Sequence, residues 1–111
     1  MKHIYSKYKN QKTKLGGFTF DSKKEAERWV KLSLLQRAGE IHNLEKQVKY
    51  ELQPKFTING KVVRAITYTA DFVYTVEGKT VVEDVKGMRT DVYKLKKKLF
   101  EYRYGIEIKE V

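Results

Sequence analysis

The sequence predicts a mixed α/β domain, and three observations carry this prediction. Two segments show helix start and stop signals, one from about Ser22 to Ala38 and one from Thr90 or Asp91 to about Tyr104. Between them, segments rich in Val, Thr, Ile, Phe and Tyr meet at the two-residue turns Asn59-Gly60 and Glu77-Gly78, which favour β-hairpins. The chain then ends in the alternating segment I-E-I-K-E-V, and a short strand that follows a helix is expected to join its sheet parallel to a neighbour.

Length and composition limit what the protein can be. Its 111 residues suit one domain, and 41% hydrophobic with 34% charged residues is typical of a soluble globular protein. The sequence has no cysteine, which excludes disulfides and thiolate zinc sites. It also has no apolar run long enough for a membrane span and no signal-peptide core. We therefore expect a cytoplasmic protein without a membrane partner.

The net charge of +10 and pI of about 9.7 predict a polyanionic partner, because Lys and Arg that neutralise phosphates release counterions and so favour binding. Solubility alone is the alternative explanation. Residues 1–17 contain lysines and no acidic residue, and we expect a mobile basic arm that lies along DNA, followed by a single folded domain over residues 18–111. A merely disordered terminus would have the same composition. The lysines of this arm that we assign to DNA binding are Lys7, Lys9, Lys12 and Lys14.

The first helix places one carboxylate on its inner side. By the helical period, the solvated side holds Lys24, Glu27, Arg28 and Lys31, and the inner side holds Ala26, Trp29, Val30 and Leu32. Glu25 falls on the inner side. A local alternative is a capping box, because S-K-K-E from Ser22 to Glu25 would let the glutamate reach back to the N-cap amide.

Three strands are expected between this helix and the second hairpin. The alternation of Val48, Tyr50 and Leu52 predicts a strand that stops before Pro54. Residues 55–58 and 61–66 flank Asn59-Gly60 and predict a first hairpin.

Two aspartates face each other in the second hairpin, from Tyr68 to Gly87, provided that its loop is the two residues Glu77-Gly78. Antiparallel partners keep a constant sum of residue numbers, so Asp71 lies opposite Asp84. Directly opposed like charges destabilise a sheet, and this pair therefore predicts a divalent cation. A loop one residue longer would separate the two aspartates.

The alternation of side chains assigns the neighbours of this pair to faces of the hairpin. Lys86 shares a face with Asp84, whereas Glu83 points to the other side, beside Phe72. Glu83 is therefore not expected to act as a ligand.

The last helix is expected to bury Val92, Leu95, Leu99 and Tyr102. Its outer side carries Lys94, Lys97 and Lys98, which we expect to follow a DNA backbone toward the hairpin. Pairing of Lys97 with Glu101 at i,i+4 offers a simpler reading of part of this cluster as a solvated face.

Together these residues predict a catalytic site. Glu25, Asp71 and Asp84 supply three carboxylates for Mg²⁺ or Mn²⁺, hard cations that prefer oxygen ligands. In phosphodiester hydrolysis such a cation polarises the phosphate and lowers the pKa of a bound water, while Lys86 would orient that water and offset developing charge.

The spacing of these residues resembles a known signature. Asp71, a twelve-residue gap and Asp84-Val85-Lys86 resemble the bipartite motif of the PD-(D/E)XK nuclease superfamily. The resemblance implies a restriction-endonuclease-like core, with a mixed sheet, flanking helices and an acidic residue on the first helix that matches Glu25. Ala70 stands where the name of the superfamily has proline, and Asp84 takes the Asp option of the motif.

Longer segments are similar to small phage-encoded endonucleases described as resolvase-like: F-D-S-K-K-E-A-E-R-W, Y-T-A-D-F-V-Y, V-V-E-D-V-K-G and Y-K-L-K-K-K-L-F. The resemblance covers nearly all of the chain after Phe18. It implies a nuclease-like domain, an Mg²⁺- or Mn²⁺-dependent endodeoxyribonuclease that cleaves branched DNA such as a Holliday junction, a homodimer, and a host-cell cytoplasm as its location. The alternatives are a non-catalytic DNA-binding module and a basic structural protein of a phage particle.

Overall fold

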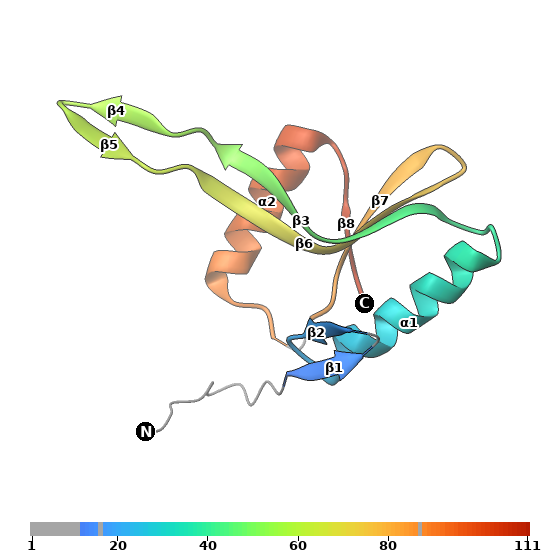
Figure 1. The fold of residues 1–111 in the computed structure, drawn as a ribbon. Coiled ribbons are helices and arrows are strands. Elements are labelled where there is room, and N and C mark those ends of the chain that lie inside the picture. Colours follow the sequence, from blue (N-terminus) through green and yellow to red (C-terminus); the bar gives the residue numbers. More distant parts are fainter. Residues whose placement is uncertain (1–11, 16, 87) are drawn as a thin grey trace, which may run out of the picture.

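A computed structural model describes residues 12–15, 17–86 and 88–111 (Figure 1). The elements follow in the order β1 (Thr13–Leu15), β2 (Phe18–Phe20), α1 (Lys23–Arg37), β3 (His42–Gln53), β4 (Phe56–Ile58), β5 (Lys61–Val63), β6 (Ile66–Val76), β7 (Lys79–Asp84), α2 (Asp91–Tyr104) and β8 (Ile108–Glu110). The predicted mixed α/β class is confirmed. The order of helix, hairpins, helix and closing strand is also the expected one.

Both helices begin and end at the predicted signals. Ser22 caps α1 by accepting a hydrogen bond from the Glu25 amide, and Thr90 caps α2 by accepting one from the Tyr93 amide. Gly105 ends α2 in the left-handed conformation, with a φ of 69°, which a residue without Cβ adopts at little cost. The helix boundaries therefore follow from local capping chemistry.

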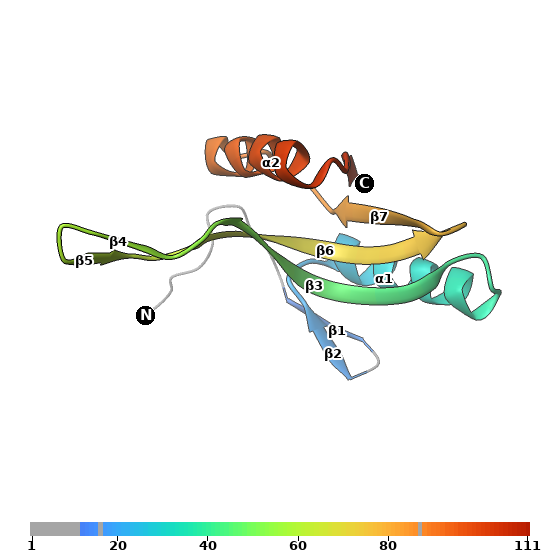
Figure 2. The same cartoon turned by 90° about the horizontal axis from the view of Figure 1, so that it is seen from above.

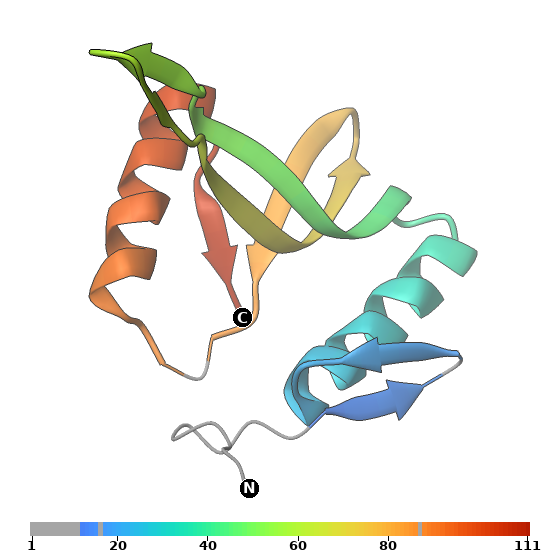
Figure 3. The ribbon, with the colours of Figure 1, turned by 60° about the vertical axis from the view of Figure 1, so that its left-hand side comes forward.

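The central sheet has four strands in the order β3-β6-β7-β8. Strand β6 pairs antiparallel with both β3 and β7, whereas β8 pairs parallel with β7, as predicted for a strand that follows a helix. Helices α1 and α2 flank these strands at opposite ends (Figure 3). Strands β1 and β2 form a separate hairpin, and β4 and β5 form another, which projects away from the sheet (Figures 1 and 2).

Both predicted two-residue turns are present. Val76 pairs with Lys79 across Glu77-Gly78, and Ile58 pairs with Lys61 across Asn59-Gly60. All four turn residues have positive φ, from 49° to 80°. A two-residue turn with positive φ at both positions matches the right-handed twist of hairpin strands, and Asn and Gly adopt it most readily.

The core is divided into two clusters along β6. Phe72 and Tyr74 belong to the cluster around α1, with Ala26 and Leu32, whereas Tyr68 and Ala70 belong to the cluster around α2, with Phe100. Asp71 lies between these two groups on the strand. Asp71 therefore marks the boundary between the two core clusters. The candidate site lies at this boundary.

The prediction for the buried side of α2 is wrong. Val92, Leu95, Leu99 and Tyr102 are all exposed, Tyr102 by 91%. Tyr93 and Phe100 are buried instead, in the cluster with Tyr68 and Ala70. The helix has apolar residues on two sides, and the sheet packs against the side with the aromatic rings.

Two other expectations change. Residues 1–11 of the expected basic arm lie outside the described residues, but Thr13–Leu15 pair with Phe18–Phe20, so the hairpin structure begins before the expected boundary at residue 17. Arg28 is not simply solvated, because its guanidinium binds the buried Glu83. Within residues 12–15, 17–86 and 88–111, neither helix has the length and apolar character needed to span a bilayer.

Candidate active site

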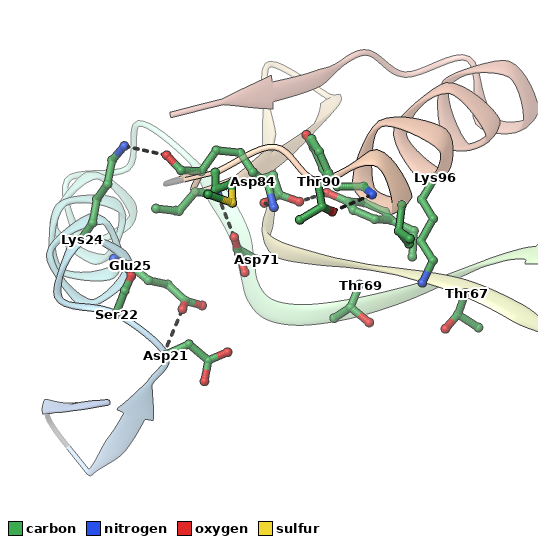
Figure 4. A pocket seen from close by; sticks show the side chains of 16 residues that line it. Asp21, Ser22, Lys24, Glu25, Thr67, Thr69, Asp71, Asp84, Thr90 and Lys96 are labelled. Carbon is green, nitrogen blue, oxygen red and sulfur yellow. Dashed lines mark hydrogen bonds and ion pairs between the residues drawn. The ribbon is translucent and has the colours of Figure 1, made fainter. Parts of the chain in front are cut away.

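Four predicted site residues from three separate elements line one cavity of about 850 Å³. Glu25 comes from α1, Asp71 from β6, and Asp84 and Lys86 from the end of β7 and the segment after it. Figure 4 shows Glu25, Asp71 and Asp84 around the same space. The sequence therefore brings together residues up to 61 positions apart.

Asp71 and Asp84 are related by the predicted register. The last pairs before them, Phe72 with Glu83 and Val73 with Val82, keep the same sum of residue numbers, so Asp71 lies opposite Asp84. One carboxylate oxygen of Asp71, Oδ2, accepts a hydrogen bond of 2.7 Å from the Val85 amide. The side chain of Asp71 is thereby fixed to the strand that carries Asp84.

The electrostatic environment of Asp71 is unfavourable for a carboxylate. Burial raises the pKa of Asp71 to about 7, and the negative charges of Asp84 and Glu25 add to this effect, although the Val85 amide opposes it. This carboxyl therefore keeps its proton to a higher pH than a free aspartate does. A group with this degree of perturbation inside a cavity is typical of a functional site.

Asp84 and Lys86 are held by aromatic neighbours. Asp84 Oδ1 contacts Lys86 Nζ at 2.7 Å, and Asp84 Oδ2 accepts a hydrogen bond of 2.5 Å from the Tyr68 hydroxyl. The Lys86 ammonium also lies 3.9 Å from the centroid of the Tyr93 ring. Tyr68 and Tyr93 belong to the core cluster around α2, and their contacts also orient Asp84 and Lys86.

Glu25 faces the cavity and also contacts the backbone near the start of α1, but not through the capping-box hydrogen bond that the sequence offered as an alternative. Its Oε1 accepts a hydrogen bond of 3.3 Å from the Asp21 amide, which lies one residue before the N-cap Ser22 and is not the donor of a capping box. Its Oε2 faces the cavity and accepts a hydrogen bond of 2.8 Å from Gln47. Burial raises the pKa of Glu25, which is only 4% exposed.

Gln47 is a site residue that the sequence analysis did not assign. Its amide Nε2 donates to Glu25 at 2.8 Å and to Asp71 Oδ1 at 3.3 Å, so it bridges two of the three carboxylates. Its φ of 55° places it in the left-handed region within strand β3, which is uncommon for a residue other than glycine. Strain of this kind gathers at functional sites, but no sequence pattern around Gln47 signals it.

Glu83 is excluded from the cavity, as the alternation of side chains predicted. It is fully buried on the other side of β7, where Arg28 Nε and Nη2 contact its two oxygens at 2.8 and 2.6 Å. Tyr74 also donates a hydrogen bond to Glu83. This acid is a structural partner of α1.

The predicted DNA-binding lysines occupy different environments. Lys7 and Lys9 lie outside the described residues, while Lys12 and Lys14 are exposed on and next to β1. Lys94 and Lys98 are exposed on α2, and Lys94 lines a cavity next to Lys86. Lys97 is half-buried and pairs with Glu101 at 3.3 Å, so the i,i+4 ion pair that the sequence offered as an alternative is present. The lysine of α2 that lines the main cavity is Lys96, which the sequence analysis had not selected.

The donor set of the cavity fits a hard divalent cation. Three carboxylates offer six oxygens, and the raised pKa of Asp71 reflects negative charge that a cation would neutralise. However, in the part of the chain that the structure describes, no three such side chains are already arranged as a ligand set. Gln47, Tyr68 and Lys86 contact the carboxylate oxygens instead, and these contacts must rearrange for the three carboxylates to share one ion.

Fold and cavity together define a small basic α/β protein in which carboxylates and lysines, among them Glu25, Asp71, Asp84 and Lys86, line one cavity. The chain belongs to the family described as "Protein of unknown function (DUF1064)", whose model matches residues 5–110. No curated protein and no solved structure matches the chain.

Proposed function

We propose that this protein is a metal-dependent DNA endonuclease related to the PD-(D/E)XK nucleases, with a restriction-endonuclease-like core. The observation that carries the proposal is the meeting of Glu25, Asp71, Asp84 and Lys86 in one cavity. The resemblance in sequence rests on the order and spacing of these residues, and the cavity is independent support because spacing alone does not bring Glu25 to the hairpin.

In this proposal Glu25, Asp71 and Asp84 would hold Mg²⁺ or Mn²⁺. The bound ion supplies Lewis-acid polarisation of the phosphate and a water of lowered pKa. The other contributions come from the chain. Lys86, fixed between Asp84 and the Tyr93 ring, is placed to orient the attacking water and to offset negative charge on the phosphate. Gln47 holds Glu25 and Asp71 in position.

The charge of the protein supports a DNA substrate. A net charge of +10 attracts a polyanion, and Lys24, Lys86 and Lys96 line the cavity itself. By resemblance, branched DNA such as a Holliday junction is the proposed substrate, cut by a homodimer with one site for each of two strands, in the cytoplasm of the host cell.

The assay for this function compares branched, duplex and single-stranded DNA in the presence of Mg²⁺ or Mn²⁺. The parent should nick at least one substrate, and Asp84→Ala and Lys86→Ala should each lose this activity, while Asp91→Ala and Lys31→Ala serve as exposed controls of the same charge change. Equal nicking by the parent and both site variants would overturn the assignment. So would the absence of nicking by the parent on every substrate.

The role of Glu25 is tested against its helix-capping contacts. Ser22→Ala removes the cap from the Glu25 amide and should cost about 0.5–2 kcal/mol of stability with cleavage retained. Glu25→Gln keeps the size of the side chain and should lose cleavage. If Glu25→Gln cleaved normally and lost only stability, the carboxylate would be a capping group and not a ligand.

A non-catalytic DNA-binding module is the second candidate, because the carboxylates in the described chain are hydrogen bonded and not assembled as a ligand set. The same assay separates the two, since this candidate cleaves no substrate in the parent or in any variant. A basic structural protein of a phage particle would show neither the cleavage nor a dependence on Asp84.

A further inference from the structure

The hairpin β4–β5 is an exposed projection without a partner in the described chain. Its strands pair with each other and form a separate two-stranded sheet at the end of β3 and β6. Figures 1 and 2 show it extending beyond the rest of the fold. We call residues 55–64 the projecting hairpin.

The projecting hairpin is both apolar and basic. Phe56, Ile58 and Val62 are exposed by 42%, 55% and 61%. Cross-strand partners share a face, so the pairs of Phe56 with Val63 and of Ile58 with Lys61 form one face of the ribbon. Lys61 therefore stands beside the apolar side chain nearest the tip.

Charge decides which partner fits this surface. Lys55, Lys61 and Arg64 are exposed, and residues 52–70 contain no Asp or Glu. A second copy of this chain, with a net charge of +10, would be repelled by the projecting hairpin. The exposed apolar residues of α2 are interspersed with lysines. A polyanion is complementary to the projecting hairpin, and a second copy is not.

The position of the projecting hairpin also connects it to the candidate site. The main cavity continues from Asp71 along β6 past Thr69 and Thr67, with Lys96 directed toward these residues from α2 (Figure 4). The projecting hairpin begins three residues beyond this cavity, at Arg64. With a strand rise of about 3.3 Å per residue, Gly60 lies at most about 35 Å from Asp71. That is about one helical turn of B-DNA.

We propose that the projecting hairpin enters a groove of the DNA duplex next to the cleavage site. The inference rests on the proposed function for the identity of the partner. The major groove, about 12 Å wide, admits a two-stranded β-ribbon, whereas the minor groove of about 6 Å does not without widening. Lys55, Lys61 and Arg64 contact phosphates at the edges of the groove, and Phe56 and Ile58 pack against the apolar edges of the bases.

The test is duplex affinity in EDTA, which prevents cleavage and leaves the binding surface intact. The probe is a fluorescent 30-base-pair duplex, and the variants are Lys61→Gln with Arg64→Gln and, separately, Phe56→Ser with Ile58→Ser. Lys31→Gln with Arg37→Gln is the matched control, because these exposed residues make the same charge change on α1. All the changed side chains are exposed, so circular dichroism should show the parent fold in each case.

The two variants should weaken binding in different ways. Loss of two phosphate contacts should reduce affinity by about 10- to 30-fold near physiological salt and lower the slope of log affinity against log salt by about 2. Loss of the apolar pair should reduce affinity by at least about 10-fold with little change in this slope. The control should retain the affinity of the parent.

Cleavage measured in parallel keeps the two proposals apart. If the hairpin variants bind the duplex as the parent does, the inference is overturned, even when Mn²⁺-dependent cleavage is present. If they bind more weakly and the parent cleaves nothing, the inference stands and the proposed catalysis fails. A change of mass in sedimentation for Phe56→Ser with Ile58→Ser, at unchanged DNA affinity, would make a second copy the occupant and overturn the inference.

Discussion

Glu83 and Asp84 are neighbours on β7, both are buried, and each contacts basic side chains and a tyrosine hydroxyl, two basic side chains for Glu83 and one for Asp84. They nevertheless differ in their charge balance. Glu83 meets the fork of Arg28, with Lys109 4.0 Å away, so its negative charge is compensated. Asp84 pairs with Lys86 but shares its cavity with Glu25 and Asp71, which form no salt bridge among the described residues.

The pKa values follow this difference. Burial acts to raise the pKa of Glu83, but the hydrogen bonds from Arg28 and Tyr74 outweigh it and hold the pKa below its usual value. In the cavity, burial and the neighbouring carboxylates raise the pKa of Asp71 to about 7. The same kinds of residue thus build a closed ion pair that stabilises the fold and an open site with unsatisfied negative charge.

The largest effect is expected when the ion pair between Arg28 and Glu83 is broken. Arg28→Ala leaves Glu83 buried without its partner and should lower the free energy of unfolding by about 3–5 kcal/mol. Urea unfolding at pH 7.5 measures this, with Arg37→Ala, at the exposed end of the same helix, as the control. A loss below about 1 kcal/mol would show that the pair contributes little and would weaken the comparison.

A divalent cation should stabilise the protein through the candidate site alone. Mn²⁺ at 100 times its dissociation constant should raise the free energy of unfolding of the parent by about 2.7 kcal/mol. Asp84→Asn should lose this gain, because it removes a proposed ligand, while Arg28→Ala should keep it on a lower baseline. Urea unfolding with and without Mn²⁺ measures the difference, and an equal gain in Asp84→Asn would place the ion elsewhere.

Gln47 contacts carboxylates of the candidate site, so its substitution should affect that site and not the Arg28–Glu83 ion pair. Removing the amide that bridges Glu25 and Asp71 in Gln47→Ala should reduce cleavage by about 10- to 100-fold, the usual cost of losing a group that orients metal ligands. Gln47→Gly should lose as much activity while relieving the left-handed backbone.

A matched control for this prediction is Gln36→Ala. The Gln36 side chain accepts a hydrogen bond of 2.8 Å from the Leu44 amide, away from the site, so its loss should affect stability and not cleavage. If Gln47→Ala cleaved at the rate of the parent, the bridge would be structural.

The sequence was sufficient for features that local chemistry decides. Capping residues set the ends of both helices, and the turn at Glu77-Gly78 set the register that places Asp71 opposite Asp84. Because side chains alternate along a strand, the same register also sent Glu83 to the other face. Four residues of the candidate site could therefore be selected without the structure.

Features that depend on distant packing could not be predicted in this way. α2 carries apolar residues on two sides, and which side is buried depends on where the aromatic rings of Tyr50 and Tyr68 lie, since these pack against Phe100. The pairing of Arg28 with Glu83 joins residues 55 positions apart. The contacts of Gln47 depend on a backbone conformation that its neighbours in sequence do not indicate.

The smallest effect is the pH dependence of stability in the metal-free protein. Its sign differs between the contributions of Asp71 and Glu83. Because the pKa of Asp71 is about 7 in the folded state and near 3.8 in the unfolded state, the folded protein binds more protons between these values, and its stability falls as pH rises from about 4 to about 7. Glu83 has a lowered pKa and contributes the opposite sign, but only as pH falls below about 4.5. In EDTA, the free energy of unfolding should therefore decrease between pH 5 and pH 7.5, by less than the limit of about 1.4 kcal/mol per pH unit for one group. Asp71→Asn should remove most of this decrease and Glu40→Gln, at an exposed position, should not; a decrease of equal size in Asp71→Asn would assign the uncompensated charge to another group.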